Sequence, residues 1–86
     1  MNTAKRMAEL TRGILTIKSE QLNYVRCKNT KERQTVAERI VSLLVECVMR
    51  NSDLIQDQSS IDSFSKALDI WNAIIKDLRR QHSITN

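Results

Sequence analysis

The residues that could take part in chemistry are few in this chain, and they lie far apart along it. Cys27 and Cys47 are separated by 19 residues, and the single histidine, His82, lies near the C-terminal end. This spacing matches neither C-x-x-C nor a zinc-ligand pattern, so we expect two reduced, core-filling thiols and no metal. Nucleophilic catalysis needs a serine or cysteine beside a base, whereas His82 falls where the last predicted helix frays.

The carboxylates and the glycine content also argue against catalysis and against a cofactor or metal site. Glu38 and Glu46 lie eight residues apart on one face of a predicted helix. That separation is about 12 Å, too long for a coupled acid–base pair. Loops that cradle phosphates, dinucleotides or calcium need several glycines, and Gly13 is the only one here. We therefore predict that the chain is not an enzyme and has no catalytic residue, cofactor or metal site.

Positive charge is concentrated in the first 34 residues, although the net charge is only +4. Three of these cations share one heptad position, opposite the apolar stripe of the first predicted helix, and three cluster at the turn that follows: Lys5, Arg12 and Arg26, then Lys28, Lys31 and Arg33. The row covers about 31 Å of helix, long enough to contact several phosphates of a nucleic-acid duplex. The simpler interpretation is that outward positions of a soluble helix are ordinarily charged.

The first predicted helix, residues 3–28, has a broad apolar face. One seam has the alternating three- and four-residue spacing of a helical stripe: Met7, Leu10, Ile14, Ile17, Gln21 and Tyr24. Ala8, Leu15, Leu22 and Val25 widen this face into a stripe suited to a helical bundle. Gly13 lies beside the stripe, where either close packing or simple tolerance accounts for it.

The second predicted helix, residues 30–50, is apolar on almost every side. Asn29 and Glu32 form a capping-box-like start. Residues 51–59 are read either as a connection or as an extension of this helix. The third helix, residues 60–81, begins at Ser59 or Ser60 and carries Trp71 on its inward seam.

Together these elements predict an all-α fold, with residues 1–86 forming a single antiparallel three-helix bundle. No proline and one glycine leave too few turn signals for a sheet. On the second helix Val41, Val45 and Met49 exceed what such a core needs. We therefore predict a homodimer, or a complex with another protein, that forms through the central helix.

Two functions remain open at this stage. The first is a small non-enzymatic regulator or adaptor that occludes a partner surface by helix packing through Val41, Val45 and Met49. The alternative is a homodimer that binds double-stranded RNA or DNA by phosphate contacts from the basic first helix. Glu46 interrupts the longest apolar run, so we expect no membrane span and a cytoplasmic location.

Overall fold

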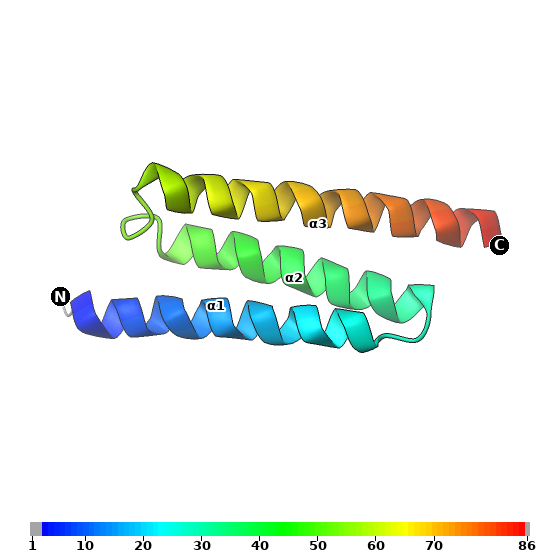
Figure 1. Cartoon of the computed structure of the whole chain (residues 1–86), viewed down its shortest axis with the longest axis horizontal. Coiled ribbons are helices and arrows are strands. Elements are labelled where there is room, and N and C mark those ends of the chain that lie inside the picture. The colour runs from blue at the N-terminus through cyan, green and yellow to red at the C-terminus, as the bar shows by residue number, and fades with distance from the viewer. Residues whose placement is uncertain (1–2, 86) are drawn as a thin grey trace.

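The chain folds into three helices that pack against one another. The computed structural model describes the backbone of residues 3–85 and the side chains of residues 3–81. Over this part of the chain there is no strand, and the helices are α1 (Thr3–Arg26), α2 (Thr30–Arg50) and α3 (Gln58–Thr85). The chain reverses direction at both connections (Figure 1). The predicted helical class and the limits of α2 are confirmed. The first helix ends two residues earlier than predicted, and α3 begins two residues earlier than predicted and continues further.

Local hydrogen bonds explain where the helices begin. Asn29 Oδ1 accepts from the Glu32 amide at 2.8 Å, and the Glu32 carboxylate accepts from the Lys28 amide at 3.0 Å, which confirms the predicted cap of α2. The cap of α3 is Asp57, not Ser59 or Ser60. Asp57 Oδ2 accepts from the Ser60 amide at 3.0 Å and from the Ser60 hydroxyl at 2.9 Å. An aspartate is the stronger acceptor, and it starts the helix earlier.

Asn51 ends α2 and settles how residues 51–59 are arranged. Its backbone amide and its side-chain Nδ2 both donate to the Cys47 carbonyl, at 3.2 and 2.8 Å. The Asn51 carbonyl in turn accepts from the amides of Leu54 and Ile55. These bonds satisfy the carbonyls of Cys47 and Asn51 within a tight turn, so residues 51–57 are a connection and do not extend α2.

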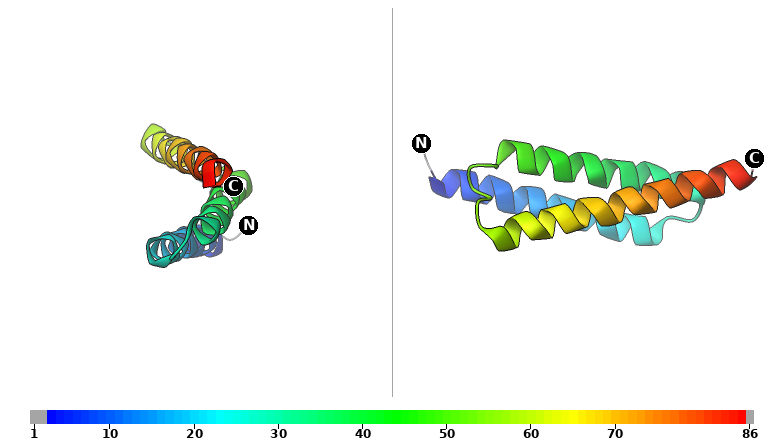
Figure 2. Two further views of the ribbon diagram at one scale, coloured as in Figure 1. Left: turned by 90° about the vertical axis from the view of Figure 1, so that its right-hand side faces the viewer. Right: turned by 90° about the horizontal axis from the view of Figure 1, so that it is seen from above.

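The helices form an open, bent layer with α2 in the middle. Both α1 and α3 pack on α2, whereas within the described residues no Cα of α1 lies within 8 Å of a Cα of α3. Seen end-on, α1 and α3 diverge from α2 (Figure 2). Only side chains bridge them: the rings of Tyr24 and Trp71 meet edge to face with centroids 5.0 Å apart. The molecule is accordingly long and thin, measuring 52 × 22 × 16 Å.

The buried core belongs mainly to α2, because only α2 has two helical neighbours. The buried apolar residues are Ile17 of α1, Val36, Ala37, Ile40, Leu44 and Cys47 of α2, Ile55 of the connection, and Ile75 and Leu78 of α3. Ile17 lies in a cluster with four α2 residues, while Ile75 and Leu78 cluster with Ala37. The apolar character around α2 therefore serves two interfaces within one chain.

The wide apolar face predicted for α1 is only partly used, and that prediction is wrong for its outer half. Leu15 and Leu22 are each 59% exposed and Val25 is 79% exposed, and Ala8 is exposed as well. The reason is that α1 packs against a single helix, which covers one seam of side chains. Ile17 lies on that covered seam.

Candidate interaction surfaces

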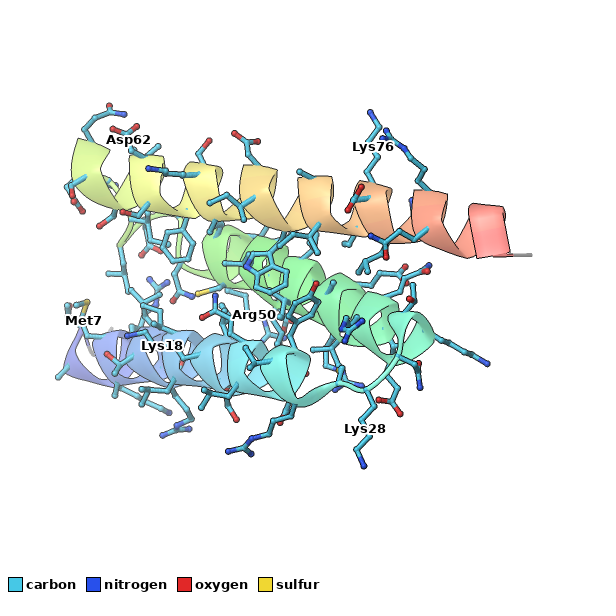
Figure 3. The ribbon with its side chains drawn as sticks, turned by 45° about the vertical axis from the view of Figure 1, so that its right-hand side comes forward. Met7, Lys18, Lys28, Arg50, Asp62 and Lys76 are labelled. Carbon is cyan, nitrogen blue, oxygen red and sulfur yellow. The ribbon has the colours of Figure 1, made fainter. Side chains whose placement is uncertain are left out.

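A second apolar seam runs along α1 and faces away from α2. Its residues follow those of the first seam by one position and keep the same alternating spacing: Ala8, Thr11, Leu15, Lys18, Leu22 and Val25. All six are exposed, and we call them the outer stripe of α1. Lys18, near the middle of the outer stripe, is labelled in Figure 3. Three large apolar side chains more than half exposed on one helix face are typical of a surface that another molecule covers.

The total accessible surface is larger than that of a compact monomer of this mass. A folded monomer of 10.0 kDa is expected to expose about 5,200 Å². This chain exposes 6280 Å². The excess of about 1,000 Å² follows from the open layer, in which α1 and α3 leave part of each other uncovered.

The cations of the predicted basic row do lie together on α1. Lys5, Arg12 and Arg26 are exposed and follow the outer stripe by one further position, with exposed Ser19 in the gap. The Arg12 side chain has no hydrogen-bond or ion-pair partner among the described residues. The row therefore borders the outer stripe directly along the helix.

The three cations at the turn are not equivalent. Lys28 and Lys31 are exposed, and Lys31 lines the same hollow of about 460 Å³ as Arg26, at the end where α1 turns into α2. Arg33 is half-buried, and its Nη2 donates to the Cys27 carbonyl at 3.5 Å. The structure thus brings Arg26 and Lys31 together but holds the Arg33 guanidinium against the protein.

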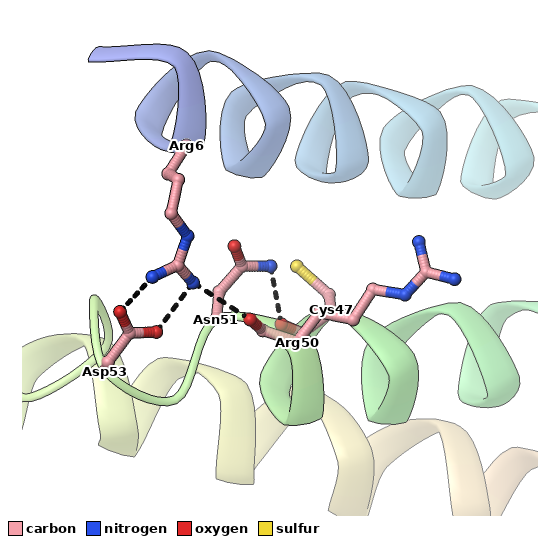
Figure 4. Close-up of polar contacts among 5 residues, drawn as sticks. All are labelled: Arg6, Cys47, Arg50, Asn51 and Asp53. Carbon is pink, nitrogen blue, oxygen red and sulfur yellow. Dashed lines mark hydrogen bonds and ion pairs between the residues drawn. The ribbon is translucent and has the colours of Figure 1, made fainter. Parts of the chain in front are cut away.

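A contact that sequence analysis missed joins the start of α1 to the connection after α2 (Figure 4). Arg6 pairs through both nitrogens with the Asp53 carboxylate, with Nη2 2.7 Å from Oδ1, and it donates to the Arg50 carbonyl at 3.1 Å. Its side-chain hydrogen bonds hold the pKa of Asp53 below its ordinary value. No local pattern predicts this pair, because its members are 47 residues apart.

The groove beside this pair has one more cation than anion in its lining, but two of its three arginines are already paired. It measures about 450 Å³ and is lined by three arginines and two glutamates, namely Arg6, Arg12, Arg50, Glu9 and Glu46. Arg50 Nη2 lies 2.9 Å from Glu46 Oε1, so one cation is already neutralised within the groove. Burial raises the pKa of the Cys47 thiol at its floor, which leaves little thiolate for reaction.

The predicted interface on α2 is smaller than the outer stripe. Val41 is half-buried and packs against the cluster that contains Ile75 and Leu78, so α3 already covers much of it. Val45 and Met49 are 41% and 74% exposed. A shallow hollow of about 480 Å³ lies between them, and its rim includes Ser42 and Glu46.

No reactive constellation is assembled within residues 3–81. No three His, Cys, Asp or Glu residues of this part of the chain gather as metal ligands would, and both cysteines are free thiols. Glu38 and Glu46 each pair with an arginine, Arg79 at 3.4 Å and Arg50 at 2.9 Å. The His82 side chain, to which we assigned no catalytic role, lies outside the described residues.

Comparisons with known proteins add no family assignment. A scan against models of protein families, a search of curated proteins and a search of solved structures find no match to this chain. In the part that the structure describes, no helix has an apolar stretch long enough to cross a membrane.

Proposed function

We propose that this chain is a small non-enzymatic regulator or adaptor that acts by packing the outer stripe of α1 against a helix of a partner. The observation that carries the proposal is the exposure of Leu15, Leu22 and Val25 on one continuous face. Such a face binds an amphipathic helix through apolar anchors at helical spacing. The partner helix also covers the side of α1 that no other helix of the described chain covers.

The outer stripe is a better contact than the α2 surface made of Val41, Val45 and Met49. Packing with α3 already takes up Val41, which leaves two exposed apolar side chains next to Glu46. The outer stripe spans 18 residues, or about 26 Å from its first Cα to its last, and only Lys18 in it is charged. A lysine at such a position can lay its aliphatic stem along apolar surface and keep its ammonium group in water.

Occlusion is the mechanism that this surface allows. The partner loses access to the helix face that the outer stripe covers, so the effect on the partner depends on affinity and concentration alone. Neither a bound cofactor nor a reacting side chain takes part in the proposed action.

Selection from a displayed library of amphipathic helical peptides tests this function. Selected peptides should carry apolar anchors at i, i+3, i+4 and i+7, and their binding should be lost in the Leu15→Glu, Leu22→Glu variant. The matched control is Val45→Glu, Met49→Glu, which places the same charges on the back of α2. Helical circular dichroism should be unchanged in both, because all four positions are exposed. Peptides that bind both variants equally would contradict the proposal.

A second candidate function is binding of duplex nucleic acid by the basic row. The observation that favours it is the exposed alignment of Lys5, Arg12 and Arg26, in which Arg12 has no partner among the described residues. Gel-shift titrations with double-stranded RNA and DNA at two salt concentrations test it. Binding should weaken with salt, by a logarithmic slope of about −0.9 for each B-DNA phosphate neutralised, and should fall in Arg12→Glu, Arg26→Glu. No shift at low salt with micromolar protein would exclude this candidate.

A further inference from the structure

We infer that the partner of the outer stripe is a second copy of this chain, whose α1 packs antiparallel on α1 with Leu22 of each copy opposite Thr11 of the other. This inference rests on the proposed function and names the partner of the same surface. Its grounds are the complementarity of the seam with itself and the area left exposed, and the charge beside the seam provides a test.

The outer stripe is complementary to itself only when it is reversed. In the proposed register, Leu22 faces Thr11, Val25 faces Ala8, and Leu15 faces Lys18 of the other copy. Each branched apolar side chain is then opposite a small or flexible one, which is the combination that interdigitates with few gaps. The two-fold axis passes between residues 16 and 17, so each contact occurs twice.

Other registers use the seam poorly. A parallel pair would place Lys18 against Lys18 in an apolar seam and leave the smallest residue, Ala8, against another Ala8. An antiparallel pair shifted by seven residues in one direction would face Ala8 and Thr11 with residues beyond the end of α1 at Arg26. A shift in the other direction would leave Val25 beyond the start of the facing helix. Of these antiparallel registers, the proposed one alone pairs all six positions within both helices.

The exposed area fits a two-chain assembly. Stable protein interfaces bury about 800 Å² on each partner, and the excess surface of this chain is about 1,000 Å². The excess is thus similar in size to the surface that each partner buries in such an interface. Since α1 has 24 residues, the seam that both copies share runs along most of its length.

The charge beside the seam gives the dimer a distinctive salt response. In an antiparallel helix pair, residues that flank the seam on one side meet the same positions of the other copy. Here that side is the basic row, so Lys5 of each copy comes next to Arg26 of the other. The repulsion between these exposed cations is screened by salt. The dimer should therefore associate more tightly as salt rises, the reverse of the response expected for duplex binding.

Cysteine pairing tests the partner and the register together. All variants carry Cys27→Ser, whose hydroxyl replaces the Cys27 thiol as donor to the Asn23 carbonyl, and all retain the buried Cys47. The variant with both Thr11→Cys and Leu22→Cys should oxidise to a covalent dimer of twice the 10.0 kDa chain mass. Neither single variant should do so, because the engineered cysteines of the two copies would lie 11 residues, or about 16 Å, apart along the seam, too far for a disulfide. Sedimentation of the unmodified chain should show a monomer–dimer equilibrium that tightens with salt.

The outcomes separate this inference from the proposed function. Covalent dimers from either single variant would indicate a parallel pair and overturn the register. A strict monomer up to hundreds of micromolar would overturn the second copy as partner, while peptide binding through Leu15 and Leu22 would still support the proposed function. A monomer that also binds no helical peptide through these residues would overturn both.

Discussion

The outer stripe of α1 and the back of α2 are two apolar regions that differ in how the fold uses their helices. The back of α2, with Val45 and Met49, belongs to a helix whose other sides are taken up by two neighbours. The outer stripe belongs to a helix with one neighbour, and half of its apolar face is left over. The comparison teaches that apolar residues all around a helix indicate a central position as readily as an interface. A broad face on a peripheral helix is the stronger sign of a partner.

The largest expected effect is on self-association. Leu22→Glu with Val25→Glu should raise the dimer dissociation constant by about 100-fold or more, because each copy would bury two carboxylates opposite Thr11 and Ala8, which offer no opposite charge. Val45→Glu with Met49→Glu should change it by less than about threefold, since these residues lie outside the proposed contact. Analytical ultracentrifugation over a concentration series at fixed salt measures both. A larger effect from the α2 pair would reverse the comparison and restore the interface first expected on α2.

Substitutions on the packed side and on the back of α2 should differ in their effect on the free energy of unfolding. Ile40 is 0% exposed between both neighbours, so Ile40→Ala should lower the free energy of unfolding by about 3 kcal/mol through lost burial and the cavity left behind. Met49→Ala on the back should change it by less than about 0.5 kcal/mol. Urea unfolding at one protein concentration measures the difference. The milder Ile40→Val, expected to cost about 1 kcal/mol, keeps the comparison measurable if Ile40→Ala does not fold.

Gly13 and Ala8 offer a smaller test on the two faces of α1. A Cβ added at Gly13 would lie 3.6 Å from Cys47 Sγ, an ordinary contact distance, so close packing does not require the glycine. Gly13→Ala should therefore stabilise the fold by about 1 kcal/mol. Ala8→Gly on the outer stripe is the matched control and should destabilise by a similar amount. A loss of stability in Gly13→Ala would show that α1 and α2 pack more tightly there than this distance indicates.

Local sequence signals predicted the helices well because their determinants are local. Asn29 with Glu32 marks the start of α2, and a run without proline sustains each helix. The predicted start of α3 at Ser59 or Ser60 is wrong, because the aspartate that precedes these serines, Asp57, caps the helix. Asp57 has no apolar residue close after it, so the seam spacing gave no reason to begin the helix there.

The number of neighbours of each helix could not be predicted, and the surfaces depend on it. The spacing of Leu15 and Leu22 shows which face of α1 they share, but a core helix and a surface helix have the same spacing. Their exposure follows from the separation of α1 from α3 in the bent layer, which is a tertiary property. The Arg6–Asp53 pair depends on the same long-range arrangement.

The smallest expected effect is the response of the α2–α3 connection to acid. Hydrogen bonds from the Ser60 hydroxyl and amide hold the pKa of Asp57 below its ordinary value of 3.8, and those from Arg6 lower the pKa of Asp53. Each carboxylate binds protons more weakly in the folded state than in the unfolded state. Its contribution to stability is therefore complete above the unfolded pKa and is lost as the pH falls through the lowered folded pKa.

Asp57→Asn isolates this acid response, because asparagine caps a helix about as well as aspartate but does not titrate. The variant should lose less stability than the unmodified chain between neutral pH and about pH 2, measured as thermal midpoints at fixed protein concentration. Asp53→Asn, which removes the titrating group at the end of α2, should likewise make the thermal midpoint less dependent on pH in the acid range. It should leave the α3 cap intact. An acid response that neither variant changes would place the titrating groups outside this connection, among the carboxylates that pair along α2.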